Sequence, residues 1–154
     1  MKTVIKPSFS VIGKEGSTQE GKGFIQRLWE EANGHFQEVA GLAKRDEQGN
    51  LVGVWGAMSD EGRRFLPWGE EFSRGLYLAG VECTDDAQPP AGWTKWTVPG
   101  YEYRVRKNDG PEAFAQGLEE LEREGLRLAG AVHDHTDPTT GQGYIYYPVR
   151  RLEP

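Results

Sequence analysis

The stretch that decides the fold is RGLYLAGVEC, residues 74–83, together with the segment TDDAQPPAG, residues 84–92, that follows it. The first segment is a continuous apolar run with a single acid, Glu82, and it predicts a buried strand. The second segment contains two prolines, two aspartates and a glycine, which favour a break over any regular element. We therefore place the midpoint of the chain at residues 84–92 and compare its two sides.

The first half predicts a strand, a helix and two further strands. Its first strand alternates loosely between apolar and polar residues and is interrupted near Pro7. Apolar residues from Ile25 to Val39 recur at steps of four and three, the spacing of one face of an amphipathic helix. The predicted elements are strands at residues 2–13, 51–58 and 74–83, a polar connection at 14–23, a helix at 25–39 and a loop at 59–73.

The second half repeats this order. Asp109-Gly110-Pro111-Glu112 is typical of a helix start, because proline suits the first turn of a helix. Phe114, Leu118 and Leu121 then form an apolar stripe that ends before Gly125. The predicted elements are a strand within residues 93–107, the helix, a strand at 126–133, a turn-rich loop at 134–143 and a last strand at 144–150.

The order β-α-β-β on both sides of the break predicts an α+β fold: a tandem pair of βαββ modules. Each module is an antiparallel sheet with one helix, and the chain is one domain, residues 1–154, with a pseudo-repeat at 1–84 and 93–154. The repeat is one of pattern, since the halves share no clear sequence identity. The uncovered sheet faces can shield each other if the modules arch over one another, and we expect a ligand cleft at their junction.

Composition excludes several classes of protein. The 154 residues fit one domain, and the net charge of −6 repels phosphate backbones and anionic membrane surfaces. We therefore expect neither nucleic acid as a direct partner nor a membrane. Cys83, the single cysteine, cannot form an internal disulfide and indicates a reducing compartment. The sequence has neither the apolar stretch of a signal peptide nor that of a membrane span, so we expect a cytoplasmic protein.

Several short motifs occur in an order and spacing that resemble a known family over nearly the whole chain. They are Leu28-Trp29, the strand from Tyr77 to Glu82, the break ending Pro89-Pro90-Ala91-Gly92-Trp93, Val98-Pro99-Gly100 followed by Tyr103, Asn108-Asp109-Gly110-Pro111 and Tyr146-Tyr147-Pro148-Val149. Together they resemble the GyrI-like small-molecule-binding domain. That family includes the effector-binding domains of multidrug-responsive transcription regulators and stand-alone single-domain proteins.

The resemblance implies a protein that binds its ligand in the cleft between the modules. The first strand begins almost at Met1, so we expect the chain to lack the DNA-binding segment of the regulators. Family members often carry a glutamate four residues before the proline of the final strand, and it helps bind cationic ligands or serves catalysis. Tyr144 stands at that position here. Glu82 is then the acid that we expect at the cleft.

Glu82 stands in an otherwise apolar strand, where a charge is costly unless it is paired or wet. In the functional interpretation it faces the cleft as a counter-ion or as a general acid or base, with a pKa raised by burial. In the alternative it is an edge charge or forms a salt bridge to an arginine such as Arg104. Both interpretations fit the sequence.

The chain is rich in aromatic residues, with five tryptophans among them. Strand side chains alternate between faces, so Tyr144 and Tyr146 share one face, which we expect to be open. Aromatic walls suit flat apolar ligands and cations, whereas the alternative is that these rings fill the core. The predicted ligand-binding residues are Glu82, Trp29, Trp55, Tyr77, Tyr103, Tyr144 and Tyr146.

Two further motifs carry little functional weight. Residues 16–23, GSTQEGKG, nearly match a phosphate-binding loop, but Gly23 replaces the hydroxyl residue that holds magnesium. The run His133-Asp134-His135 offers two imidazoles that zinc could use, yet its place before a loop is typical of a polar hairpin end. We therefore expect no metal and no cofactor.

The leading hypothesis is the binding of a small, largely apolar molecule, cationic or aromatic, for sequestration or sensing. The alternative is a hydrolase of strained electrophilic small molecules, in which Glu82 activates water and Tyr103 or Tyr144 orients the substrate. A further alternative, implied by the resemblance, is a protein-interaction module that acts on gyrase. The sequence leaves all three open.

Overall fold

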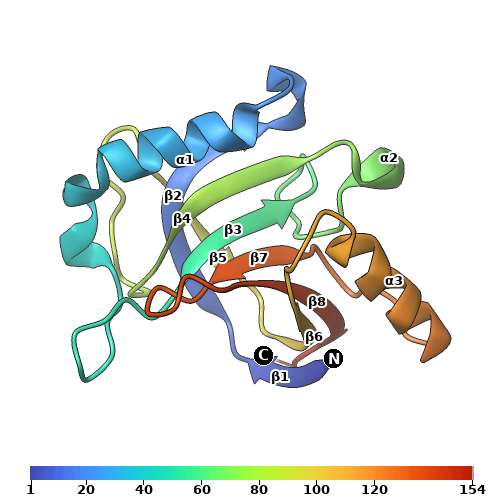
Figure 1. Ribbon diagram of the computed structural model, residues 1–154. Coiled ribbons are helices and arrows are strands. Elements are labelled where there is room, and N and C mark those ends of the chain that lie inside the picture. The colour runs from blue at the N-terminus through green and yellow to red at the C-terminus, as the bar shows by residue number, and fades with distance from the viewer. Residues whose placement is uncertain (154) are drawn as a thin grey trace.

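Eight strands form one antiparallel sheet in the computed structural model, which describes residues 1–153 (Figure 1). The strand order is β1-β6-β8-β7-β3-β4-β2-β5. None of the helices within residues 1–153 is both long and apolar enough to cross a membrane. The elements are β1 (Lys2–Lys6), β2 (Phe9–Ser17), α1 (Phe24–Gly34), β3 (Val54–Ser59), α2 (Gly69–Phe72), β4 (Leu76–Cys83), β5 (Thr94–Val98), β6 (Tyr101–Lys107), α3 (Ala113–Arg123), β7 (His133–Thr136) and β8 (Gly143–Arg151).

The predicted α+β fold with two βαββ units is confirmed, and the two units share a single sheet. One unit consists of β2, α1, β3 and β4, and the other of β6, α3, β7 and β8. They join through β3 and β7, where Gly56 lies opposite Asp134 and Trp55 opposite His135. The remaining strands are exchanged between the halves, because β1 pairs with β6 and β5 pairs with β2.

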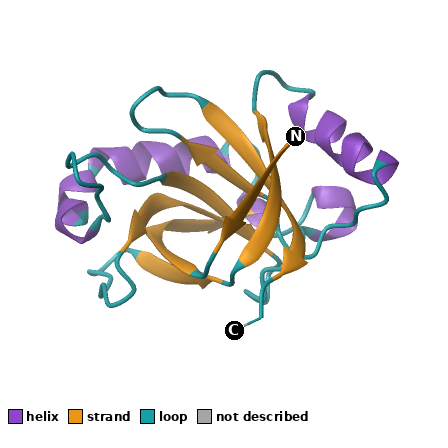
Figure 2. Ribbon diagram, turned by 90° about the horizontal axis from the view of Figure 1, so that it is seen from below, coloured by secondary structure: helices purple, strands orange, loops and turns teal. Residues whose placement is uncertain are grey.

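Both long helices lie on the same face of the sheet, which we call the outer face (Figure 2). Helix α1 buries Phe24, Leu28 and Ala32 against the side chains of β2 and β4 that point to this face. Helix α3 buries Leu121 against Ile145 and the strands of the second unit. Their apolar stripes thus cover the two ends of one sheet face and leave its middle between them.

The opposite face, which we call the inner face, is buried by curling of the sheet. Val11 and Leu78 are fully buried there although no helix covers them. Gly13 and Gly80 lie opposite each other in β2 and β4, and a Cβ on either would collide with the backbone of the partner strand. Such close approach requires glycine and permits the tight curl.

The structure corrects the predicted bounds of three elements. β2 continues to Ser17, into the predicted connection. Ser17 then caps a short 3-10 turn at Thr18–Glu20. α1 ends at Gly34, and a 3-10 turn at Phe36–Glu38 replaces its predicted last part. The predicted strand at 126–133 is wrong, because β7 runs from His133 to Thr136, in the predicted loop. Its polar residues belong to the sheet because the ladders to β3 and β8 satisfy its backbone.

Candidate functional site

A cavity of about 330 Å³ opens on the outer face, between α2 and α3. In Figure 1 these two helices stand one above the other on the right, and β3, β7 and β8 lie to their left. Strand residues form the floor, the start of α3 forms one wall, and the segment through α2 forms the roof. The lining residues are Met58, Pro67, Trp68, Phe72, Asn108, Gly110, Pro111, Phe114, Val132, Asp134 and Ile145.

The roof is positioned by a loop that folds around Asp60. Its carboxylate accepts hydrogen bonds from the backbone N–H groups of Gly62, Arg64 and Leu66. Burial acts to raise the pKa of Asp60, but these hydrogen bonds and the Arg64 side chain outweigh it and hold the pKa at about 2. Further along, the indole Nε1 of Trp68 donates to a β4 carbonyl at 2.9 Å. The roof is therefore held by hydrogen bonds within its own loop and by one bond to β4.

The last part of the roof has a strained backbone. Glu70, Glu71 and Phe72 adopt φ values between 50° and 65°, in the left-handed region that residues with a side chain avoid. The ring of Phe72, 37% exposed, packs edge-on against Phe114 with the centroids 5.2 Å apart. Strain of this kind clusters at ligand sites, where the surrounding structure maintains it.

Asp134 supplies the one charge among the described residues that line this cavity. In β7 it lies between Gly56 of β3 and Ile145 of β8, so its side chain points to the outer face. Burial raises its pKa from 3.8 to about 6, and no opposing contribution from a hydrogen bond or an ion pair within residues 1–153 is resolved. At neutral pH the cavity therefore holds an unpaired carboxylate among apolar and aromatic side chains.

Known structures share this architecture. No family model matches the chain, and no curated protein matches it significantly in sequence. SAV2435 bound to tetraphenylphosphonium superposes with a TM-score of 0.61 at 18% identity, covering 97% of this chain and 93% of that one. The C-terminal domain of EcmrR gives 0.60 at 13% identity over 98% of both chains. A hydrolase from Listeria innocua gives 0.54 at 13% identity over 96% of this chain and 90% of its own.

The chain has the GyrI-like fold. The resemblance found in the sequence is thus borne out at the level of the fold by neighbours that include SAV2435 and the C-terminal domain of EcmrR. The match to the EcmrR chain in a complex of EcmrR with DNA covers 98% of the present chain but 58% of the EcmrR chain.

Within this GyrI-like fold, the predicted site residues lie on two faces of the sheet. Five of them face inward: Glu82, Trp55, Tyr103, Tyr144 and Tyr146. The carboxylate of Glu82 accepts a hydrogen bond from Trp55 Nε1 at 3.1 Å and pairs with Lys6 Nζ at 3.2 Å. Glu82 thus forms a salt bridge, the alternative that the sequence left open, with a lysine of β1 in place of an arginine.

The inward aromatic residues pack on one another. Trp55 and Tyr146 have ring centroids 5.0 Å apart, and Tyr146 and Tyr103 lie 5.3 Å apart. Trp55 and Tyr103 are almost completely buried. None of these residues lines the cavity between α2 and α3. Tyr144 also lies on the inner face, so the lack of an acid at this position does not determine the charge of that cavity.

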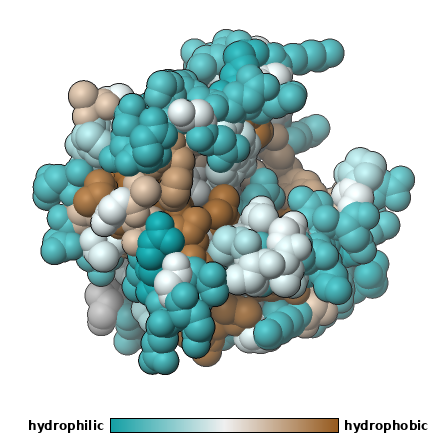
Figure 3. Space-filling view, turned by 60° about the vertical axis from the view of Figure 1, so that its left-hand side comes forward, coloured by the Kyte–Doolittle hydropathy of each residue, from teal (hydrophilic) through white to brown (hydrophobic). Residues whose placement is uncertain are grey.

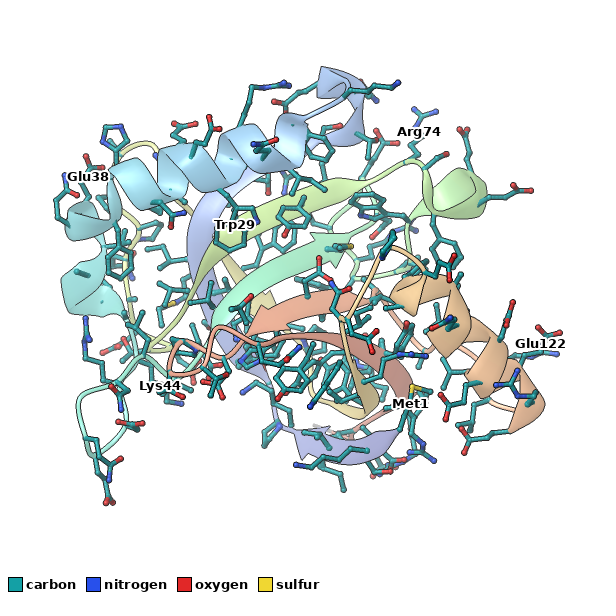
Figure 4. All side chains as sticks on the ribbon, viewed as in Figure 1. Met1, Trp29, Glu38, Lys44, Arg74 and Glu122 are labelled. Atoms are coloured by element: carbon teal, nitrogen blue, oxygen red, sulfur yellow. The ribbon has the colours of Figure 1, made fainter. Side chains whose placement is uncertain are left out.

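Trp29 and Tyr77 lie on the outer face of the sheet. The side chain of Trp29 extends from α1 toward the strands (Figure 4), and its Nε1 donates to the Tyr77 hydroxyl at 3.0 Å. Tyr77 pairs in register with Met58 of the cavity floor. Burial, and secondly the charge of Asp134, raise the pKa of Tyr77, so its hydroxyl stays protonated. The seven predicted residues therefore do not converge on one cavity, and neither of these two is among the residues that line the cavity between α2 and α3.

Sequence reasoning missed Asp134 because the residue was assigned to a loop. The available signal was the alternation Val132, Asp134, Thr136, which places the acid on the same face as Val132 once the strand is extended. The roof residues Trp68 and Phe72 carried no comparable signal, since their segment has no periodic pattern.

Proposed function

We propose that the protein binds a small, largely apolar cation in the cavity between α2 and α3, with Asp134 as the counter-ion. The observation that carries this proposal is the unpaired, mostly buried carboxylate in an apolar cavity. An unpaired buried charge is costly, and natural proteins retain such groups mainly where they act on a ligand or a substrate.

The size and chemistry of the cavity support a compact ligand. Its volume of about 330 Å³ lies at the lower end of the range for small-molecule sites. A cation about 4 Å from the carboxylate gains about 4 kcal/mol at the effective dielectric of a protein surface. The rings of Trp68, Phe72 and Phe114 each add about 0.5–2 kcal/mol if the charge lies over their faces. SAV2435, which has the same fold, is bound to tetraphenylphosphonium, a cation of this class.

The proposal gives binding a defined pH dependence. Only the ionised form of Asp134 attracts a cation, and its pKa in the free protein is about 6. We expect a constant affinity above about pH 7. Below pH 6 the affinity should fall about tenfold per pH unit, because each unit reduces the ionised fraction tenfold.

The direct test is calorimetric titration of tetraphenylphosphonium into the wild type and Asp134→Asn at pH 7.5. We expect saturable binding at one site that weakens at least tenfold in Asp134→Asn. The matched control is Asp86→Asn, which removes the same charge from an exposed position in the central break. Equal affinities in the wild type and Asp134→Asn would refute the role of Asp134.

A second candidate function is hydrolysis in the same cavity, and one observation favours it. A carboxylate with a pKa of about 6 is suited to act as a general base near neutral pH. The hydrolase of Listeria innocua also shares the fold. In this case Asp134, instead of Glu82, would activate water against a strained electrophilic substrate. Turnover that persists unchanged in Asp134→Asn would exclude this assignment.

A further inference from the structure

A second, smaller cavity lies on the outer face under α1. It has a volume of about 150 Å³ and is lined by Ile12, Trp29, Ala32, Asn33, Phe36, Val39, Leu51, Val54, Gly80, Val81 and Trp93. None of these described lining residues is charged. Figure 3 turns the left side of Figure 1 forward and shows apolar residues in the middle of that side, within a hydrophilic rim. This cavity is suited to an uncharged, apolar group.

The two cavities are neighbours along β3. Val54 lines the smaller cavity and Met58 lines the larger one, and both side chains point to the outer face. Four residues of a strand span about 13 Å. Gly56 stands midway between them, on the same face, and Asp134 is its partner in β7. The distance between the cavities is therefore within the reach of one elongated ligand.

Tyr77 fills the space between the cavities. Its hydroxyl end lies directly over Gly56, where any side chain on residue 56 would collide with it. Glycine at this position thus leaves room for the phenol ring to cross β3. A ring in this place lies between Val54 and Met58, which line the two cavities.

Trp29 holds Tyr77 in this position. Besides the hydrogen bond from its Nε1, the Trp29 ring packs edge-on against Tyr77 with the centroids 6.4 Å apart. Phe24 also packs edge-on against the same ring, with the centroids 6.5 Å apart. Tyr77 is almost completely buried, whereas Trp29 is half-buried and itself lines the smaller cavity. The indole is therefore the part of this arrangement that a ligand or a substitution can displace most easily.

We propose that Trp29 and Tyr77 form a divider that sets the maximum length of the ligand. The inference rests on the proposed function, since it assumes that the cation lies beside Asp134. With the divider in place, the protein accepts compact cations and excludes their apolar arms from the cavity under α1. Without the divider, the two cavities form one elongated site for a cation that carries a long alkyl arm.

The test is a series of alkyltriphenylphosphonium ions, from methyl to decyl, titrated calorimetrically into the wild type and Trp29→Ala. In the wild type we expect the affinity to stop rising after the first few methylenes. In Trp29→Ala it should continue to rise by about threefold to fourfold for each further methylene that becomes buried. Trp29→Leu, which retains more apolar volume, should show the same trend with a smaller gain and guards against misfolding of the alanine variant.

The matched control is Phe36→Ala. Phe36 is half-buried and lines the smaller cavity from the turn after α1, and the ring contacts that hold Tyr77 come from Phe24 and Trp29, so the loss of Phe36 enlarges that cavity but leaves the divider intact. This variant should show the chain-length dependence of the wild type. An identical dependence in the wild type and both Trp29 variants would overturn the proposal that Trp29 holds the divider closed, while leaving the proposed function standing. Failure of methyltriphenylphosphonium to bind the wild type would refute the proposed function itself.

Discussion

Replacing Asp134 with asparagine should stabilise the free protein at neutral pH. Folding moves this carboxylate into apolar surroundings, and burial raises its pKa from 3.8 to about 6. Each pKa unit corresponds to about 1.4 kcal/mol, so ionised Asp134 costs the folded state at most about 3 kcal/mol at pH 7.5. Asparagine has a similar shape and carries no charge, and it removes this cost.

The sign of the pH dependence follows from the direction of the shift. Between pH 4 and pH 6 the folded protein still holds the Asp134 proton, whereas the unfolded chain has lost it. The folded state binds more protons, and the contribution of Asp134 to stability therefore falls as the pH rises through this window. The advantage of Asp134→Asn should be near zero below pH 4, about half of its full size at pH 5 and complete above pH 7.

The assay is equilibrium urea unfolding of the wild type and Asp134→Asn at pH 4, 5, 6 and 7.5, followed by tryptophan fluorescence. Taking the difference between the two proteins cancels groups that titrate equally in both. Asp86→Asn serves as the control for loss of one surface charge and should change the free energy of unfolding by less than about 0.5 kcal/mol. An Asp134→Asn protein that is equally or less stable than the wild type at pH 7.5 would refute the account of a costly, unpaired carboxylate.

Three further predictions concern stability elsewhere in the molecule. Glu82→Gln breaks the buried pair with Lys6 and should lower the free energy of unfolding, measured in urea, by about 3 kcal/mol. The affinity for tetraphenylphosphonium should stay unchanged. A loss of affinity without a loss of stability would place the ligand on the inner face. Glu71→Gly relieves a left-handed backbone, so it should raise the free energy of unfolding by about 1 kcal/mol and with it the melting temperature. A lower melting temperature would show that the roof is not strained. Asp60→Ala should cost about 2 kcal/mol at pH 7, and because the pKa of Asp60 is lowered to about 2, the difference from the wild type should shrink as the pH falls from 4 toward 2.

The sequence was sufficient to predict the fold class and the positions of most elements. The steps of four and three from Ile25 onward locate α1, and the apolar run ending at Cys83 locates β4. Prolines and glycines mark the breaks between elements because they restrict or extend the backbone conformation locally. These signals are local, and local patterns are enough to define such elements.

The site depends on contacts that no local pattern carries. β7 is a short polar strand whose place is fixed by pairing with β3 and β8, so the sequence around Asp134 resembles a hairpin end. The alternation of Tyr144 and Tyr146 correctly separates two faces, but it does not show that the sheet curls and buries the face without helices. The same curl brings Lys6 to Glu82, from strands that are far apart in the sheet order. The curl of the sheet thus pairs Glu82, the acid predicted for the cleft, with Lys6, whereas Asp134 stays unpaired.

The measurement that tests the central claim most directly is a crystal structure of the protein with tetraphenylphosphonium. We expect the cation in the cavity between α2 and α3, in contact with Asp134 and with the rings of Trp68 and Phe114, and the salt bridge between Lys6 and Glu82 intact. A cation bound on the inner face beside Glu82, with Lys6 displaced, would contradict the account.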